Sequence, residues 1–232
     1  MKRKDKTVYG KLYGVSTGPG DPELMTLKAV KIIEKCGVIA APKTGAEKTL
    51  ALDIASQAVD ISGKTVITLD MPMTHDREEL ARSRYDAACR IAEYLKKGED
   101  TAMLNIGDVS IYSTFSYVAE EVRKMGFETE AAAGVPSFCA AAAELGISLT
   151  EGHQPLTVIP AQNKNAVGLL SSDGTKVIMK SGKKLSEIKE LLKESAGTVC
   201  AVENCGLPGQ KIYRSLDEIN ECGYFTLIIA KA

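Results

Sequence analysis

The segment from residue 101 to residue 114 places polar side chains at a sharp break in the chain. Residues 101–104 are typical of a short buried strand, Gly107 and Asp108 follow it, and a helical pattern begins near Ser113. In open α/β sheets, ligands bind in the crevice beyond the carboxyl ends of the strands. Gly107 would let a ligand approach the backbone, and Asp108 would supply a negative charge. The alternative is a plain strand-to-helix turn, capped by the hydroxyl of Ser113 or Thr114.

A second candidate is the loop Gly18-Pro19-Gly20, which follows the first expected strand. It does not match G-x-x-x-x-G-K-[ST], so the lysine that binds phosphates in such loops is missing. It does not match G-x-G-x-x-G either, and Pro19 lacks the amide hydrogen that a phosphate would accept. The next strand ends at Pro42 rather than at an acidic residue that could bind a ribose. We therefore expect a helix-entry turn or a loop for a ligand other than a dinucleotide.

Other familiar chemistry has no support in the sequence. The six cysteines form no C-x-x-C pair, and His75 and His153 form no H-E-x-x-H or similar metal-binding pair. We expect the cysteines to be buried thiols rather than metal ligands, and we expect no metal site.

Composition narrows the function classes further. The chain has 232 residues, a net charge of −1 and no tryptophan, so we expect neither nucleic acid nor a membrane surface as a partner. No apolar run approaches the roughly 20 residues of a membrane span. The charged start, residues 1–6, is not followed by an apolar signal region, so a cytoplasmic location is expected.

Strands and helices alternate through the first half of the chain, which is typical of a parallel sheet covered on both faces. Asp21 is expected to cap a helix with Pro22 at its first position. The expected strands are 8–15, 38–41, 65–69, 101–104 and 128–132, and the later helices are 50–59, 76–97 and 114–125.

The second half contains expected strands at 156–159, 176–179, 198–203 and 224–230, with helices at 138–145 and 185–194. Short connections between the later strands favour antiparallel pairs and hence a mixed sheet. We therefore predict an α/β protein with two domains, residues 1–115 and 116–232.

Two segments carry a family resemblance. Residues 14–29 (GVSTGPGDPELMTLKA) resemble the N-terminal signature of the tetrapyrrole (corrin and sirohaem) methyltransferases, and Gly107-Asp108 with Ile111-Tyr112 resembles their second signature. The resemblance extends over the whole chain. Within the family, residues 107–114 and 134–138 are most similar to the precorrin-2/cobalt-factor II C20-methyltransferases.

The resemblance implies a two-lobed α/β fold, a homodimer, and S-adenosyl-L-methionine held between the lobes. It implies methyl transfer to C20 of cobalt-factor II or precorrin-2, in the porphyrin-related pathway to cobalamin; the sequence does not separate the two substrates. Two alternatives stay open: a family member that methylates another tetrapyrrole position, and a non-catalytic nucleotide-binding module. In methyl transfer the cofactor brings its own activated methyl group, so no nucleophilic triad is needed, and alignment in a water-poor cleft would supply catalysis.

The resemblance also assigns site residues. The chemistry of methyl transfer, rather than the resemblance, suggests two catalytic roles: Tyr112 would orient substrate or cofactor, and His75 would take up the proton released after methylation or would simply be exposed. Ile106 and Cys205 stand where sirohaem-type members have glycine, so contacts there would use the backbone. The expected cofactor contacts are Pro19, Ile106, Gly107, Asp108, Ile111, Ser113 and Thr114 from the first lobe, and Ser137, Met179, Ala201, Asn204 and Cys205 from the second.

Cationic side chains should line the mouth of a site for a substrate with many carboxylates. The candidates near strand ends and helix starts are Lys43, Arg77, Arg82 and Arg84. The alternative for each is a solvated helix face.

Overall fold

The computed structural model describes residues 8–43, 49–181, 184–195 and 197–231, so the charged start at residues 1–6 lies outside it. The chain forms two compact units, Met1–Pro136 and Ser137–Ala232. The expected division after residue 115 is therefore too early. The helix and strand that follow residue 115 belong to the first unit, because that strand pairs with the first strand of the chain.

The first unit is built on a five-stranded sheet in the order β3-β2-β4-β1-β5. Every strand pair in it is parallel, which confirms the expectation from the alternating pattern. The carboxyl ends of all five strands therefore lie at the same edge. The strands are β1 (Leu12–Ser16), β2 (Val38–Lys43), β3 (Thr65–Asp70), β4 (Thr101–Asn105) and β5 (Thr129–Ala132).

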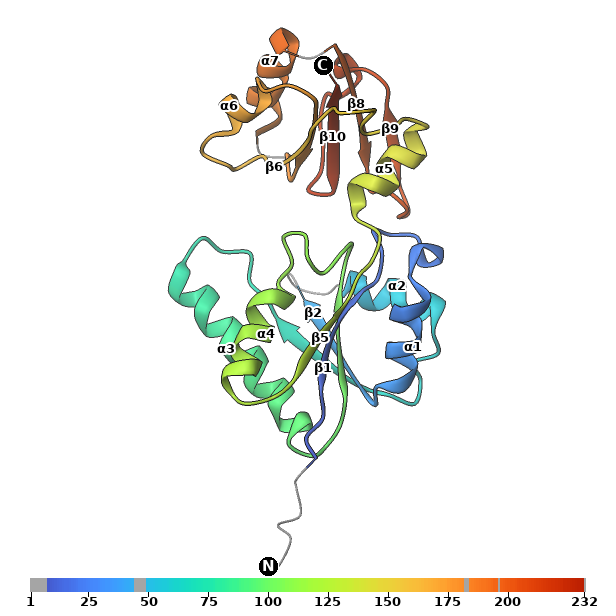
Figure 1. Ribbon diagram of the computed structural model, residues 1–232, viewed down its shortest axis with the longest axis vertical. Coiled ribbons are helices and arrows are strands. Elements are labelled where there is room, and N and C mark those ends of the chain that lie inside the picture. Colours follow the sequence, from blue (N-terminus) through green and yellow to red (C-terminus); the bar gives the residue numbers. More distant parts are fainter. Residues whose placement is uncertain (1–7, 44–48, 182–183, 196, 232) are drawn as a thin grey trace, which may run out of the picture. The chain divides into compact units, whose positions relative to one another are not determined.

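Helices cover both faces of this sheet. Figure 1 shows α1 and α2 on one side and α3 and α4 on the other. Their apolar stripes form the core; on the α3–α4 side, for example, Ile91 and Val118 are fully buried with Leu12. The elements are η1 (Pro22–Leu24), α1 (Leu27–Lys35), α2 (Leu50–Ala58), α3 (Arg77–Leu95) and α4 (Phe115–Lys124).

The first long helix begins later than expected. Asp21 does cap a helical turn, since its carboxylate accepts a hydrogen bond from Glu23 N, but that turn is the short η1. Met25 then adopts an extended backbone, with φ −71° and ψ 134°. Thr26 caps α1 by accepting a hydrogen bond from Ala29 N at 3.2 Å. Two cap residues close together thus divide what the sequence presents as one helix.

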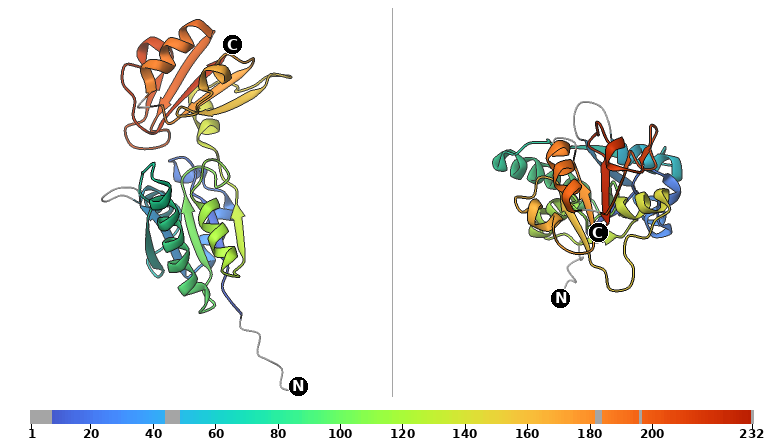
Figure 2. Two further views of the ribbon diagram at one scale, coloured as in Figure 1. Left: turned by 90° about the vertical axis from the view of Figure 1, so that its left-hand side faces the viewer. Right: turned by 90° about the horizontal axis from the view of Figure 1, so that it is seen from above.

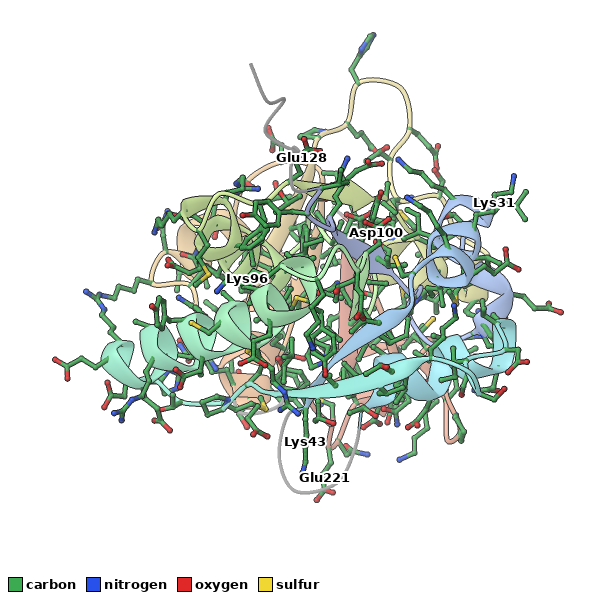
Figure 3. All side chains as sticks on the ribbon, turned by 90° about the horizontal axis from the view of Figure 1, so that it is seen from below. Lys31, Lys43, Lys96, Asp100, Glu128 and Glu221 are labelled. Carbon is green, nitrogen blue, oxygen red and sulfur yellow. The ribbon has the colours of Figure 1, made fainter. Side chains whose placement is uncertain are left out.

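The amino-terminal edge of the first sheet is held by charges. Lys35 Nζ lies 2.7 Å from an Asp100 carboxylate oxygen, and Lys11 Nζ lies 2.9 Å from Glu130. Asp100, labelled in Figure 3, also accepts a hydrogen bond from Lys11 N at 2.9 Å. These pairs tie down the edge of the sheet opposite to the strand carboxyl ends.

The second unit contains a mixed sheet in the order β6-β7-β10-β8-β9. β6 and β7 are parallel, and the other pairs are antiparallel, as the short connections indicated. The sequence missed the three-residue strand β9 and the five-residue helix α6, which are too short for a periodic signal. The strands are β6 (Leu156–Pro160), β7 (Thr175–Met179), β8 (Thr198–Glu203), β9 (Lys211–Tyr213) and β10 (Thr226–Lys231).

The helices of the second unit also lie on two faces. Leu170 of α6 and Ile188 of α7 pack in one core with Ala201 and Ile228 of the sheet. The views from the side and from above agree that α5 lies on the other face, where it contacts β8 and β10 (Figures 1 and 2). The bounds are α5 (Ser137–Leu145), α6 (Ala166–Leu170), α7 (Leu185–Ser195) and η3 (Leu216–Glu218).

One packing contact in the first unit leaves no room for a side chain. A Cβ on Gly14 of β1 would lie 2.5 Å from the ring of Phe115, the first residue of α4. We expect Gly14→Ala to lower the free energy of unfolding by about 1–3 kcal/mol, the usual cost of overpacking a core. Urea unfolding measures this. Gly37→Ala is the control, because a Cβ on Gly37 meets no atom within 4 Å. Equal urea midpoints for the two variants would contradict the prediction.

Candidate functional site

Three loops meet at the carboxyl edge of the first sheet. They follow β4 (residues 106–114), β1 (residues 17–21) and β5 (residues 133–136), whose strands are neighbours in the order β4-β1-β5. In this sheet the chain first moves from β1 to β2 and on to the edge strand β3. It then returns in the opposite direction, through β4 to the other edge strand, β5. Such a reversal of direction opens a crevice at the strand ends, where open α/β sheets bind ligands.

The glycine loop after β1 is joined to the turn after β4 through the backbone. Gly18 and Gly107 form an isolated antiparallel bridge, in which Gly107 N donates to Gly18 O at 2.8 Å. Both residues have a φ of 73°, in the left-handed region that favours glycine. Thr17 N adds a bond of 2.8 Å to Asn105 O. Pro19 is buried beside this bridge.

The Asp108 carboxylate joins the turn after β4 to the loop after β5. It accepts hydrogen bonds from Gly134 N at 2.6 Å and from Ser110 N at 2.8 Å, and a further one from Ser110 Oγ. Only 7% of the residue is exposed. Burial alone would raise the pKa of Asp108, but the bonds from Gly134 and Ser110 outweigh it and hold the pKa below its ordinary value. The negative charge expected here is thus present, and the carboxylate that carries it already accepts hydrogen bonds from the protein.

Ser16 supports the same junction from beneath. Its hydroxyl donates to Ala132 O at 2.8 Å and accepts from Val109 N at 3.0 Å, so it links the ends of β1, β4 and β5. A Cβ on Gly134 would lie 2.2 Å from the Cβ of Ser16. The sequence analysis missed Ser16, although a polar residue that ends a buried strand is a usable signal.

Asn105 and Ser113 close the turn on its other side. Ser113 Oγ donates to Asn105 Oδ1 at 2.6 Å and accepts from Phe115 N at 3.0 Å. Ser113 therefore supplies the capping bond at the start of α4, whereas Thr114 makes no side-chain cap there. Asn105 Nδ2 also donates to Ile106 O at 2.8 Å. Asn105 is the second positioning residue that sequence reasoning missed.

The remaining candidates of the turn present apolar and aromatic groups. Ile106, Ile111 and Thr114 are half-buried, and Tyr112 is 50% exposed. Tyr112 has a φ of 48°, in the left-handed region that non-glycine residues adopt rarely. The turn thus combines apolar side chains, backbone polar groups and one partly exposed aromatic ring.

His75 lies away from this junction. It is exposed in the loop between β3 and α3, next to Asp76, which caps α3 by accepting from Glu78 N at 2.8 Å. β3 is the edge strand on the other side of β2 from β4. The structure therefore places His75 on the same edge of the sheet but not in the bonded junction of the three loops.

The candidates of the second unit gather mainly at one edge of its sheet. Met179 ends β7, and Asn204 and Cys205 follow β8; β10 separates these two strand ends. Asn204 has a φ of 53°, and its N donates to Phe225 O at 3.0 Å. The Ala201 side chain is fully buried in the core of the unit instead, and Ser137 begins α5.

The cysteines follow the expectation of burial only in part. Cys36, Cys200 and Cys205 are buried, but Cys139 is exposed on α5, because the helix turns that position away from its sheet. Among the described residues, no group of three or more histidines, cysteines or acidic residues is placed to hold a metal ion. No helix in the described ranges is long and apolar enough to cross a membrane.

Comparison with known proteins extends these observations. The family model of the tetrapyrrole (corrin/porphyrin) methylases matches residues 11–220. A probable cobalt-precorrin-2 C(20)-methyltransferase of Methanocaldococcus jannaschii is 36% identical over 214 residues, which cover 90% of each chain.

Solved structures share the fold. A cobalt precorrin-4 methyltransferase gives a TM-score of 0.76 at 20% identity, with 95% of this chain and 94% of that chain covered. A uroporphyrin-III C-methyl transferase of Thermus thermophilus, complexed with S-adenyl homocysteine, gives 0.70 at 18% identity, with 96% and 92% covered.

The bonds at Asp108 lead to a prediction about stability. Asp108→Asn removes the charge that three donors approach, so we expect it to lower the free energy of unfolding by about 2–3 kcal/mol at neutral pH. Because the folded pKa lies below the unfolded value of about 3.9, the contribution of Asp108 is present above that value. It is lost as the pH falls through the folded pKa.

Thermal unfolding of the wild type and of Asp108→Asn at a series of pH values measures this dependence. The difference between the two proteins should shrink as the pH falls below about 4. Asp173→Asn, at an exposed position in the second unit, is the control for loss of a charge alone. A difference that stays constant over the whole pH range would contradict the prediction.

Proposed function

Because this chain belongs to the tetrapyrrole (corrin/porphyrin) methylases, we propose that it transfers a methyl group from S-adenosyl-L-methionine to C20 of cobalt-factor II, or of precorrin-2, its metal-free and more reduced counterpart, in cobalamin biosynthesis. The observation that carries the proposal is the 36% identity with the archaeal C(20)-methyltransferase over 90% of both chains. The name of that relative includes cobalt, which favours the metal-loaded substrate.

The junction of loops suits a cofactor of mixed polarity. Ile106 and Ile111 offer half-buried aliphatic surface on either side of Asp108, and Gly107 between them brings no side chain to the turn. In the second unit, Met179 offers a thioether and the Asn204–Cys205 turn offers backbone groups. These residues, with Pro19, Ser113, Thr114 and Ser137, are the cofactor contacts of the proposal.

S-adenosyl-L-methionine brings a methyl group already activated on a sulfonium, so the protein need not create an electrophile. The role left to the chain is to hold the reacting atoms in line and to exclude water. Asp108, Ser16 and Asn105 serve this role by fixing the loops. Tyr112 orients the substrate, and His75 is the candidate for accepting the proton that the ring carbon loses.

The homodimer and the cytoplasmic location implied by the family resemblance and by composition are part of the same proposal. A member acting at another tetrapyrrole position is the main alternative. It differs from the proposal in where the new methyl group is attached.

The first test is direct. The protein is incubated with S-adenosyl-L-methionine labelled with carbon-13 in its methyl group and with cobalt-factor II, without oxygen. We expect the mass of the tetrapyrrole to rise by one carbon-13 methyl group less the hydrogen that it replaces, and the carbon-13 signal to show the methyl group attached at C20. A methyl group at another carbon would select the alternative. No methylation, despite calorimetric binding of S-adenosyl-L-homocysteine, would refute the proposed substrate.

A backbone variant tests the cofactor site. Gly107→Ala forces a side chain into a left-handed backbone, which costs about 1–2 kcal/mol and displaces the turn. We expect about tenfold weaker calorimetric binding of S-adenosyl-L-homocysteine. Gly126→Ala is the matched control, because Gly126 has a φ of 91° in the same unit but follows α4 at the other edge of the sheet. Equal affinity of the two variants would remove Gly107 from the site.

A further inference from the structure

A charged hollow of about 530 Å³ lies at the carboxyl ends of β2 and β3 in the first unit. We call it the β2–β3 hollow. Its charged lining residues are Lys43, Asp70, Glu79, Arg82, Asp86 and Arg90. None of these residues belongs to the junction of loops around Asp108, so the hollow is a separate feature of the same unit.

The position of the hollow relates it to the proposed site. Lys43 and Asp70 are partners in the last register position of β2 and β3, at the same sheet edge as the turn after β4. Neighbouring strands lie about 4.8 Å apart, so one spacing separates β2 from β4, and three spacings, about 14 Å, separate β3 from β1. A ligand several strand spacings wide would reach from the junction of loops to the hollow.

The cations of the hollow are placed on two supports. Arg82 and Arg90 project from α3 together with Glu79 and Asp86, at steps of three and four residues that put them on one helix face. Lys43 is half-buried at the end of β2. Among the described residues, no carboxylate oxygen lies within 4.0 Å of the charged nitrogens of these three cations.

Arg90 shows how the hollow is kept in shape. Its Nη1 donates to Thr68 O of β3 at 2.7 Å, which fixes α3 to the edge strand. The remaining N–H groups of Arg90 and the guanidinium group of Arg82 are planar sets of donors. Such a set can bind a carboxylate through two parallel hydrogen bonds.

We infer that the β2–β3 hollow binds an acidic side chain at the rim of the tetrapyrrole, with Arg82 and Lys43 as its ligands. This inference rests on the proposed function, since the substrate class comes from there. It also separates the four cationic residues predicted from the sequence into those that line the hollow and those that do not. Lys43 and Arg82 line the hollow, whereas Arg84 stacks 3.7 Å above the ring of Tyr117 and Arg77 is outside the lining.

The acidic residues of the hollow allow the charge of the bound group to be tested. Asp70, Glu79 and Asp86 would repel a bound carboxylate, so removal of one of them should tighten binding. A ligand that entered with a cationic group would respond in the opposite direction. Tighter binding after this removal would therefore indicate an acidic group on the ligand, and weaker binding would indicate a basic one, without a structure of the complex.

The experiment measures binding of cobalt-factor II by absorbance titration, and its KM in the methylation assay. We expect Arg82→Gln and Lys43→Gln each to raise the Kd and the KM about tenfold, the effect of one charge-assisted hydrogen bond. The affinity for S-adenosyl-L-homocysteine should not change. Asp86→Asn should lower the Kd of the tetrapyrrole about two- to threefold.

Two variants control for loss of charge alone. Arg123→Gln removes an exposed arginine at the end of α4, and Lys96→Gln removes the lysine that follows α3 at the other edge of the sheet, labelled in Figure 3. Both should bind cobalt-factor II as the wild type does. Wild-type affinity in Arg82→Gln and Lys43→Gln, or weaker binding in Asp86→Asn, would overturn the inference.

The outcomes keep the two proposals apart. If the wild type methylates cobalt-factor II and all variants behave alike, the hollow is excluded and the proposed function stands. If the wild type binds the tetrapyrrole without methylating it, the proposed function fails, and the order of the Kd values still decides whether the hollow holds the acidic side chain.

Discussion

The buried carboxylate of Asp108 is the interaction on which the site depends. It lies in the turn after β4 and accepts hydrogen bonds from that turn and from Gly134, which follows β5 on the far side of β1. Loops at the end of a parallel sheet have no partner strand for their amides, and a buried amide without a partner costs free energy. One carboxylate, backed by Ser16, meets this need and fixes the crevice at the same time.

Local patterns were sufficient to predict most of the fold. The parallel first sheet, the mixed second sheet and the sharp turn at Gly107–Asp108 all follow from apolar runs and glycine positions within a few residues of each other. The domain boundary did not follow, because it depends on the pairing of β5 with β1 across more than a hundred residues of chain. Asp21 and Thr26 are both good caps, and no local rule shows that Thr26 begins the long helix.

The site shows the same limit at the level of side chains. The sequence identified Asp108 as a fixed charge. Its partner Gly134 is 26 residues away, so the motif could not predict that the carboxylate joins two loops. Backbone strain was equally hidden. In the described chain, the three non-glycine residues with positive φ are Tyr112, Lys180 and Asn204; Lys180 and Asn204 directly follow β7 and β8, and Tyr112 lies in the turn after β4.

The charge of the whole chain and the charges of the β2–β3 hollow act over different distances. With a net charge of −1, the protein has no overall field that would draw in a polyanion. Exposed charges are screened within about 8 Å at physiological ionic strength, so recognition of an acidic ligand has to come from cations in contact with it. Lys43 and Arg82 stand among three carboxylates in the same hollow. An acidic group is therefore favoured only where it reaches the cations directly, and this arrangement selects the position of a carboxylate rather than negative charge in general.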